Sequence, residues 1–93
     1  MDELKIDGAV FYGYTIPISK GAILLIRGGK GMLGCGYFSL DTAEKLGDAM
    51  AIVSGVKSYD DMLEAVVKAV SPEAAACGVS CGMTGREALK LLS

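Results

Sequence analysis

The residue best suited to chemistry in this chain of 93 amino acids is a cysteine that stands between two glycines. In Gly34-Cys35-Gly36 the thiol has little side-chain cover from its own strand, and such bare backbone lets another segment or a ligand approach closely. A thiol becomes reactive when a helix N-terminus or a nearby cation lowers its pKa. The basic residues that could supply this charge are Lys30, Lys57 and Arg86. Two interpretations stay open for Cys35: a reactive thiol, or a small buried hydrophobic residue, which is the commoner state of a free cysteine.

The absence of histidine limits the chemistry further. Without it no Cys–His or Ser–His pair can form, even between identical chains, and histidine-bound zinc is excluded. Cys77 and Cys81 have a C-x3-C spacing, but a structural zinc site needs a second such pair. Three cysteines is also an odd number, which argues against a disulfide framework. We therefore expect no metal site and no cofactor.

Two glycine-rich segments have both a functional and a structural interpretation. Gly29-Lys-Gly-Met-Leu-Gly34 matches the GxGxxG pattern of dinucleotide-binding turns, but that pattern requires its last glycine to open a helix. Here Gly34 leads into residues typical of a strand, which favours a glycine-rich hairpin. The segment Gly82–Leu89 combines two glycines with a helix start, so its amides and Arg86 could bind an anion. A well-specified helix start explains the same pattern, and we favour it.

The first part of the chain predicts an antiparallel meander of three strands. Apolar and aromatic residues alternate from Ile6 to Ile18, which indicates one long strand. Pro17 has no N–H to donate, so it places that end of the strand at an edge or at the strand's exit. Ala22–Ile26 is apolar on both faces, as expected of a central strand. After the Gly-Gly turn, Met32–Phe38 is predicted to return as the third strand.

Helix signals dominate the rest of the chain. Asp41 and Glu44 resemble a capping box for a short helix that Gly47 ends. Ala49–Ser54 follows as a fourth strand, which a right-handed crossover would pair in parallel with the third. The remaining helix signals are Ser58 before the apolar stripe Met62 to Val70, Ser71-Pro72 with Gly78 as the stop, and a capping box of Thr84 and Glu87.

Together these elements predict an α+β fold. It comprises the N-terminal three-stranded antiparallel meander, a helix, a fourth strand that makes the sheet mixed, and C-terminal helices packed on one sheet face. Length predicts a single domain over residues 1–93. Within it, residues 1–38 form a β-rich region and residues 39–93 an α/β region.

Composition points to self-association. Hydrophobic residues make up 52% of the chain, and a mean hydropathy of +0.44 is high for a small domain. The surplus apolar surface predicts a homo-oligomer. A net charge of −2 with scattered basic residues argues against nucleic-acid binding. The acidic N-terminus is not a secretory signal, and no apolar run could span a bilayer, so we expect a cytoplasmic protein without a membrane partner.

Four short motifs, in this order and spacing, resemble the YunC-like family of small uncharacterised bacterial and archaeal proteins. They are Cys35-Gly36, Gly55-Val56, the acidic helix start Asp60-Asp61, and GMTGREAL at Gly82–Leu89. The family's biochemical activity is not established. The resemblance implies that the N-terminal β region mediates oligomerisation, specifically as a tetramer. This chain departs from the pattern near Gly47, where it is a little shorter.

Two hypotheses of function follow. The first is a structural or small-ligand-binding homo-oligomer, assembled through its N-terminal strands. The alternative is a cysteine-dependent enzyme or redox sensor that uses Cys35 as its nucleophile, with lysine or arginine in place of histidine. The candidate ligand-binding residues are Gly34, Gly36, Gly55, Lys57, Gly85 and Arg86.

Overall fold

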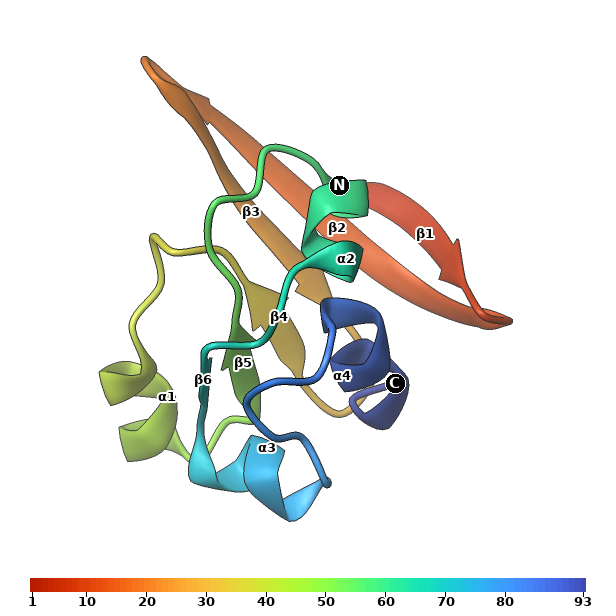
Figure 1. Ribbon diagram of the computed structural model, residues 1–93, viewed down its shortest axis with the longest axis vertical. Coiled ribbons are helices and arrows are strands. Elements are labelled where there is room, and N and C mark those ends of the chain that lie inside the picture. Colours follow the sequence, from red (N-terminus) through yellow and green to blue (C-terminus); the bar gives the residue numbers. More distant parts are fainter.

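A six-stranded mixed sheet with four helices makes up the computed structural model, which describes all 93 residues (Figure 1). The strands are β1 (Asp2–Ile6), β2 (Ala9–Ile18), β3 (Gly21–Arg27), β4 (Met32–Gly34), β5 (Met50–Ile52) and β6 (Ala69–Val70). The helices are α1 (Leu40–Leu46), α2 (Tyr59–Glu64), α3 (Pro72–Ala76) and α4 (Gly85–Leu91). None of these short helices is long and apolar enough to cross a membrane.

The order of the strands in the sheet follows their order in the chain. Strands β1 to β4 form an antiparallel meander. The crossover through α1 then makes β5 parallel to β4, with Leu33 opposite Ala51, and β6 returns antiparallel to β5. The predicted α+β class with a mixed sheet is therefore confirmed, including its one parallel pair.

The meander has one strand more than predicted. The single long strand expected over residues 6–18 is wrong at its start, because Asp7 and Gly8 form a tight turn in which both residues have positive φ, +51° and +85°. Two central residues of positive φ are what a two-residue hairpin requires, and Asp-Gly is a favoured pair for it. Residues 2–6 consequently pair with residues 9–13 as an additional strand.

Further element boundaries also differ from the predictions. The fourth predicted strand, Ala49–Ser54, is shortened to Met50–Ile52. The third strand of the predicted meander ends at Gly34 rather than Phe38. The N-cap of α1 is Ser39, whose hydroxyl accepts from the Asp41 N–H at 3.3 Å, rather than Asp41. Helix α2 ends at Glu64 and does not continue to Val70.

The early end of α2 has a physical reason in the hydrogen bonds that follow it. The N–H of Val67 donates to the carbonyl of Met83 at 2.8 Å, and that of Lys68 donates to the carbonyl of Ile52 at 2.8 Å. These backbone groups are paired across the fold, so they are not available to extend the helix. The valine-rich segment thus leads into the edge strand β6, as β-branched residues favour.

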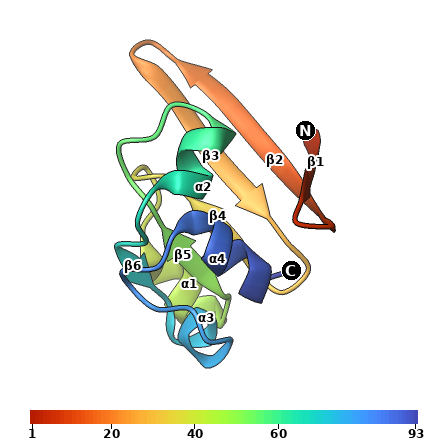
Figure 2. The ribbon, with the colours of Figure 1, turned by 45° about the vertical axis from the view of Figure 1, so that its right-hand side comes forward.

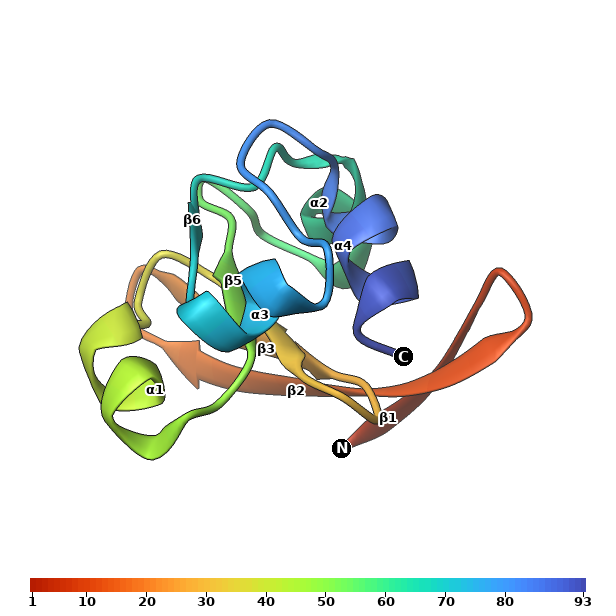
Figure 3. The ribbon, with the colours of Figure 1, turned by 90° about the horizontal axis from the view of Figure 1, so that it is seen from below.

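The core lies between the sheet and the C-terminal helices. Figure 3 shows α2, α3 and α4 together on one side of the long β2 and β3 strands. Helix α4 packs on β4 and α2, and α3 packs on β5. A cluster of 17 buried residues fills this layer, with Phe11, Ile26 and Leu33 from the sheet and Leu89 and Leu92 from the C-terminal end. The predicted placement of helices on one sheet face agrees with this arrangement.

The β2–β3 hairpin extends beyond the helical layer (Figure 2). Strand β1 reaches only as far as Gly13, so the segment from Tyr14 to Ile18 has a free edge. Pro17 lies in that free segment, which confirms the edge position predicted from its missing N–H. On the face opposite the core, Ile16 is 55% exposed and Val10 42% exposed.

Candidate functional site

Three segments that are distant in sequence meet at one edge of the sheet. Because β4 and β5 are parallel, their carboxyl ends point the same way; β3 is antiparallel to β4, so its amino end lies at that edge too. Residues 35–37 follow β4, residues 55–57 come after β5, and Ala22 lies at the start of β3. In α/β sheets, ligands bind outside the carboxyl ends of parallel strands. The chain therefore brings its Cys-Gly and Gly-Val motifs together where ligands are commonly held (Figure 1).

Two adjoining hollows occupy this position, and we call them together the Cys35 cleft. We name them by their lining: the inner hollow, which Cys35 lines, has a volume of about 190 Å³, and the outer hollow, which two lysines line, about 430 Å³. Ala22, Tyr37, Gly55 and Val56 line both of them. Cys35 and Gly36 complete the inner hollow. Lys20, Gly21 and Lys57 complete the outer one.

Cys35, which lines the inner hollow, is joined to β3 by two hydrogen bonds with Leu24. Its Sγ accepts a hydrogen bond from the Leu24 N–H at 3.3 Å, and its own N–H donates to the Leu24 carbonyl at 3.1 Å. The residue is only 3% exposed. Cys35 is thus fixed beside the cleft and presents very little surface to solvent.

The outer hollow carries positive charge. Lys20 and Lys57 are exposed and line it, and no aspartate or glutamate lines either hollow. Neither lysine forms an ion pair, since both ion pairs in the protein belong to Arg86. The nearby Asp61 carboxylate accepts from the Lys57 backbone N–H at 3.0 Å rather than from its ammonium.

The glycines of the cleft border open space. A Cβ added at Gly55, where φ is +73°, would meet nothing within 4 Å. One added at Gly36 would reach only Ser54, at 3.4 Å. Gly34, the other glycine beside Cys35, is different, because a Cβ there would lie 2.6 Å from the Met50 Cε and 2.8 Å from the Phe38 ring. The structure thus places Gly34 in packed surroundings rather than in the cleft.

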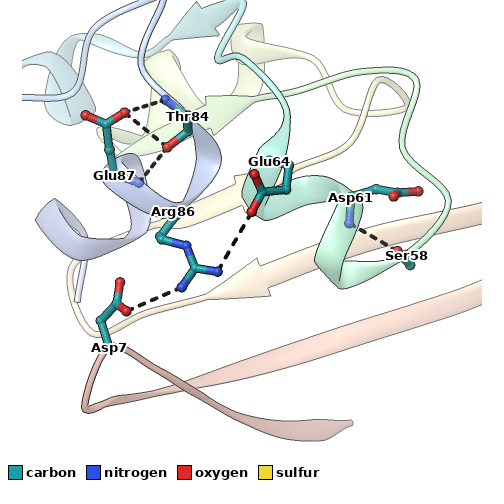
Figure 4. A network of polar contacts seen from close by, with 7 residues as sticks. All are labelled: Asp7, Ser58, Asp61, Glu64, Thr84, Arg86 and Glu87. Atoms are coloured by element: carbon teal, nitrogen blue, oxygen red, sulfur yellow. Dashed lines mark hydrogen bonds and ion pairs between the residues drawn. The ribbon is translucent and has the colours of Figure 1, made fainter.

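Gly85 and Arg86 lie at the start of α4, outside the cleft. The Gly85 N–H donates to the Ala65 carbonyl at 2.9 Å, and a Cβ on Gly85 would collide with the Met62 carbonyl oxygen. Arg86 joins the β1–β2 turn to α2, with its Nη1 3.3 Å from the Asp7 carboxylate and its Nη2 3.9 Å from the Glu64 carboxylate (Figure 4).

The first turn of α4 is closed by its own side chains. Glu87 accepts from the Thr84 N–H at 3.1 Å and donates its own N–H to the Thr84 hydroxyl at 3.2 Å (Figure 4). The predicted capping box is therefore confirmed. The motif Gly82–Leu89 is therefore explained as a helix start. Gly85 and Arg86 within it hold α4 in contact with α2 and the residue that follows it.

A polar chain that the sequence did not signal ties the N-terminus to α2. The Tyr59 hydroxyl donates to the Asp2 carboxylate at 2.8 Å and accepts from the Thr15 hydroxyl at 2.8 Å. Burial raises the pKa of the Tyr59 phenol above 10.0, and the Asp2 carboxylate adds to the rise although the Thr15 hydrogen bond opposes it. The Tyr59 ring also covers Gly13. These partners are 44 and 57 residues apart, so no local pattern could have revealed them.

The other two cysteines lie away from the cleft lining. Cys77 is half-buried and Cys81 is exposed, and all three thiols are free. Cys81 donates through its Sγ to the Lys68 carbonyl at 3.3 Å. No group of three side chains of the kinds that bind metals comes together anywhere in the fold.

Comparison with known proteins places the chain among relatives without an assigned role. A family model described as "Domain of unknown function (DUF1805)" matches residues 34–92. The uncharacterised protein YunC of Bacillus subtilis is 32% identical over 95 residues, covering 96% of this chain and 92% of YunC. The crystal structure of a protein of unknown function from Thermoplasma acidophilum matches with a TM-score of 0.93 and 36% identity, covering 99% of this chain and 90% of that one.

Proposed function

The chain belongs to the family described as a domain of unknown function, DUF1805, and we propose that it binds a small molecule in the Cys35 cleft as part of an assembly of identical chains. One observation carries the proposal. Four of the residues selected from the sequence, Cys35, Gly36, Gly55 and Lys57, line one cleft although they come from two separate loops.

The size and lining of the cleft suit a small molecule. The outer hollow, at about 430 Å³, falls within the range of roughly 300–1,000 Å³ typical of small-molecule sites. Ala22 and Val56 supply an apolar wall, and the bare backbone of Gly36 and Gly55 leaves room for close approach. Apolar walls with a few polar groups are the usual composition of such sites.

A fragment screen by ligand-detected NMR tests this proposal. Val56→Trp fills the cleft, whereas Val66→Trp adds the same bulk at an exposed position outside it. We expect fragments to bind the unmodified protein and Val66→Trp equally, and to lose binding to Val56→Trp. Circular dichroism establishes that both variants are folded. A screen without hits, or hits that Val56→Trp retains, would contradict a binding role for the cleft.

Self-association is proposed through the face of the β2–β3 hairpin that points away from the core. Its side chains are almost all apolar or aromatic: Val10, Tyr12, Tyr14, Ile16, Ile18, Ile23 and Leu25. Arg27 lies at one end of this face, 5.4 Å from the Tyr12 ring centroid and within 3.4 Å of the Tyr14 hydroxyl. The charged residues beside this face are Arg27, which forms no ion pair, and Glu3 and Lys5 of β1, which pair with Tyr12 and Val10. The apolar surface between them can pack against its own copy around a two-fold axis, which favours an identical chain as the partner.

The proposal extends to a tetramer, as the family resemblance implies. A tetramer of two-fold symmetry needs two different contact surfaces on each chain. The β2–β3 hairpin offers two, namely its outward apolar face and the free edge of the segment Tyr14–Ile18. Pro17 interrupts the N–H groups of that edge, so only a short stretch is available for pairing.

Sedimentation velocity tests the assembly. Ile16→Asp introduces a charge on the outward face, and Leu46→Asp introduces one at a still more exposed position on α1. We expect the unmodified chain and Leu46→Asp to sediment as tetramers and Ile16→Asp to dissociate, since an unpaired charge is costly in a dry contact. A compact monomer for the unmodified chain at micromolar concentration would contradict self-association.

A cysteine-dependent enzyme or redox sensor is the second candidate function. It is favoured by one observation: Cys35 lines the same cleft, and its Sγ accepts a hydrogen bond from the Leu24 N–H. Thiol labelling across pH separates the two candidates in a chain whose other cysteines are replaced (Cys77→Ser, Cys81→Ser). Rapid modification of Cys35 below neutral pH would support the enzyme. Labelling only after unfolding would exclude it and leave the binding function.

A further inference from the structure

We infer that the Cys35 cleft takes a small organic anion, with its negative group at the outer hollow and a compact apolar group in the inner one. This inference rests on the proposed binding function and specifies the class of ligand. Its basis is the distribution of charge and unpaired amides around the cleft.

The cations of the outer hollow form no ion pair, although the Asp61 carboxylate accepts from the Lys57 backbone N–H. Lys20 and Lys57 come from different loops and line the same hollow, while the chain as a whole has a net charge of −2. No carboxylate lines the cleft, and neither ammonium has an ion-pair partner. Two like charges gathered at one opening create a local positive potential that attracts anions.

Backbone amides at the same edge add to this preference. The N–H groups of Gly36, Tyr37, Gly55 and Val56 donate to no acceptor within the protein. Backbone N–H groups are strong donors, and those that border a ligand site commonly bind carboxylate or phosphate oxygens. The positive charge and the available donors thus favour the same chemistry.

The inner hollow determines the size and polarity of the group at the other end of the ligand. Ala22, Val56 and Cys35 line this hollow, and the Sγ of Cys35 already accepts the Leu24 N–H. A volume of about 190 Å³ suits a single ring or a short branched chain. The ligand class is therefore a carboxylate or a phosphate ester with one compact apolar group.

Benzoate, its neutral isostere benzamide, and phenyl phosphate are the probes for this inference. Each is titrated into isotope-labelled protein while the amide resonances of Gly36 and Gly55 are followed. We expect benzoate to bind at least about threefold more tightly than benzamide, because exposed charge contacts are individually weak but two lysines contribute. Raising the ionic strength should weaken the binding of benzoate and leave the binding of benzamide unchanged.

Lysine substitutions inside and outside the cleft provide the matched control. Lys20→Gln with Lys57→Gln should reduce benzoate binding to the level of benzamide, whereas Lys30→Gln, in the β3–β4 turn, should change nothing. Phenyl phosphate carries more negative charge than benzoate near neutral pH, so a phosphate ester is favoured only if phenyl phosphate still binds more tightly at high ionic strength. The reverse order favours a carboxylate. Both orders support an anion.

Two results would overturn the inference. Equal binding of benzamide and benzoate, unaffected by the lysine substitutions, would make the cleft a site for neutral ligands and leave the proposed function standing. The inference would also be overturned if none of the three probes binds while neutral fragments from the screen still bind the unmodified protein and not Val56→Trp. If the screen fails as well, the proposed function fails with it.

Discussion

The loops of the cleft and the start of α4 are both glycine-rich, and both were candidates for ligand binding, yet the fold treats their glycines in opposite ways. Gly36 and Gly55 border open space at the edge of the sheet. Gly85 and Gly34 lie where neighbouring atoms leave no room for a methyl group. The first pair keeps a cavity accessible, and the second pair lets packed elements approach each other.

This difference shows that glycine can serve two unrelated structural roles. Bare backbone can expose amides to a ligand, or it can admit a backbone carbonyl from another helix, as Gly85 admits the Met62 carbonyl. The same contrast separates the two basic residues. Arg86 is held by the Asp7 and Glu64 carboxylates, whereas Lys57 has no ion-pair partner and lines the cleft.

The largest effect is expected from Gly85→Ala. The new methyl group would collide with the Met62 backbone carbonyl, which no side-chain rotation can relieve, so α2 and α4 must move apart. We expect a loss of about 3 kcal/mol or more in the free energy of unfolding, measured by denaturant titration. A loss below about 0.5 kcal/mol would mean that α2 and α4 are not in close contact, and the comparison between the two regions would break down.

A smaller but sharper contrast is expected at the two glycines that flank Cys35. In Gly34→Ala the methyl group meets the Met50 side chain and the Phe38 ring, and overpacking of this kind costs about 1–3 kcal/mol. In Gly36→Ala it meets only Ser54 at an ordinary distance, so a change within about 0.5 kcal/mol is expected. Equal losses in the two variants, in parallel thermal and denaturant melts, would contradict this assignment.

The smallest effect concerns the polar chain at Tyr59. Tyr59→Phe removes the hydrogen bonds to Asp2 and Thr15, at a cost of about 1 kcal/mol near neutral pH. Since the pKa of Tyr59 is raised in the folded state, the folded protein retains its phenolic proton longer than the unfolded chain. Its contribution to stability is complete below pH 10 and is lost as pH rises through the raised pKa.

The measurement for Tyr59 is the difference in unfolding free energy between the unmodified protein and Tyr59→Phe as pH increases. Using the difference removes the titration of the other tyrosines and the lysines, which both proteins share. The difference should be constant below pH 10 and shrink above it. A constant difference throughout the alkaline range would show that Tyr59 is not buried against Asp2.

Much of the fold was predictable because local chemistry determines it. Ser58, Ser71 with Pro72, and the Thr84–Glu87 box each mark a helix start, and Gly47 ends α1 with a φ of +76°. The crossover between the third and fourth predicted strands implied a parallel pair. That pairing brings Cys35 and Gly55 to the same edge, so the cleft follows from a topology that the sequence indicated.

One prediction failed for a local reason, and the others failed because of contacts made at long range. The alternation of residues 6–18 continues through Asp7-Gly8, so the period alone concealed a turn that the dipeptide itself favours. Helical spacing continued past Glu64, but Val67 and Lys68 find backbone partners on other segments. The different roles of Gly34 and Gly36 depend on Met50 and Phe38, whose positions relative to Cys35 no local pattern describes.

The central claim, that the Cys35 cleft rather than the start of α4 is the binding site, is tested most directly by mapping amide chemical shifts during titration with a bound fragment. We predict that the resonances of Gly36, Gly55 and Val56 move together and saturate, while those of Gly85 and Arg86 stay in place. Saturating shifts at Gly85 and Arg86, with Gly36 and Gly55 unmoved, would contradict the account.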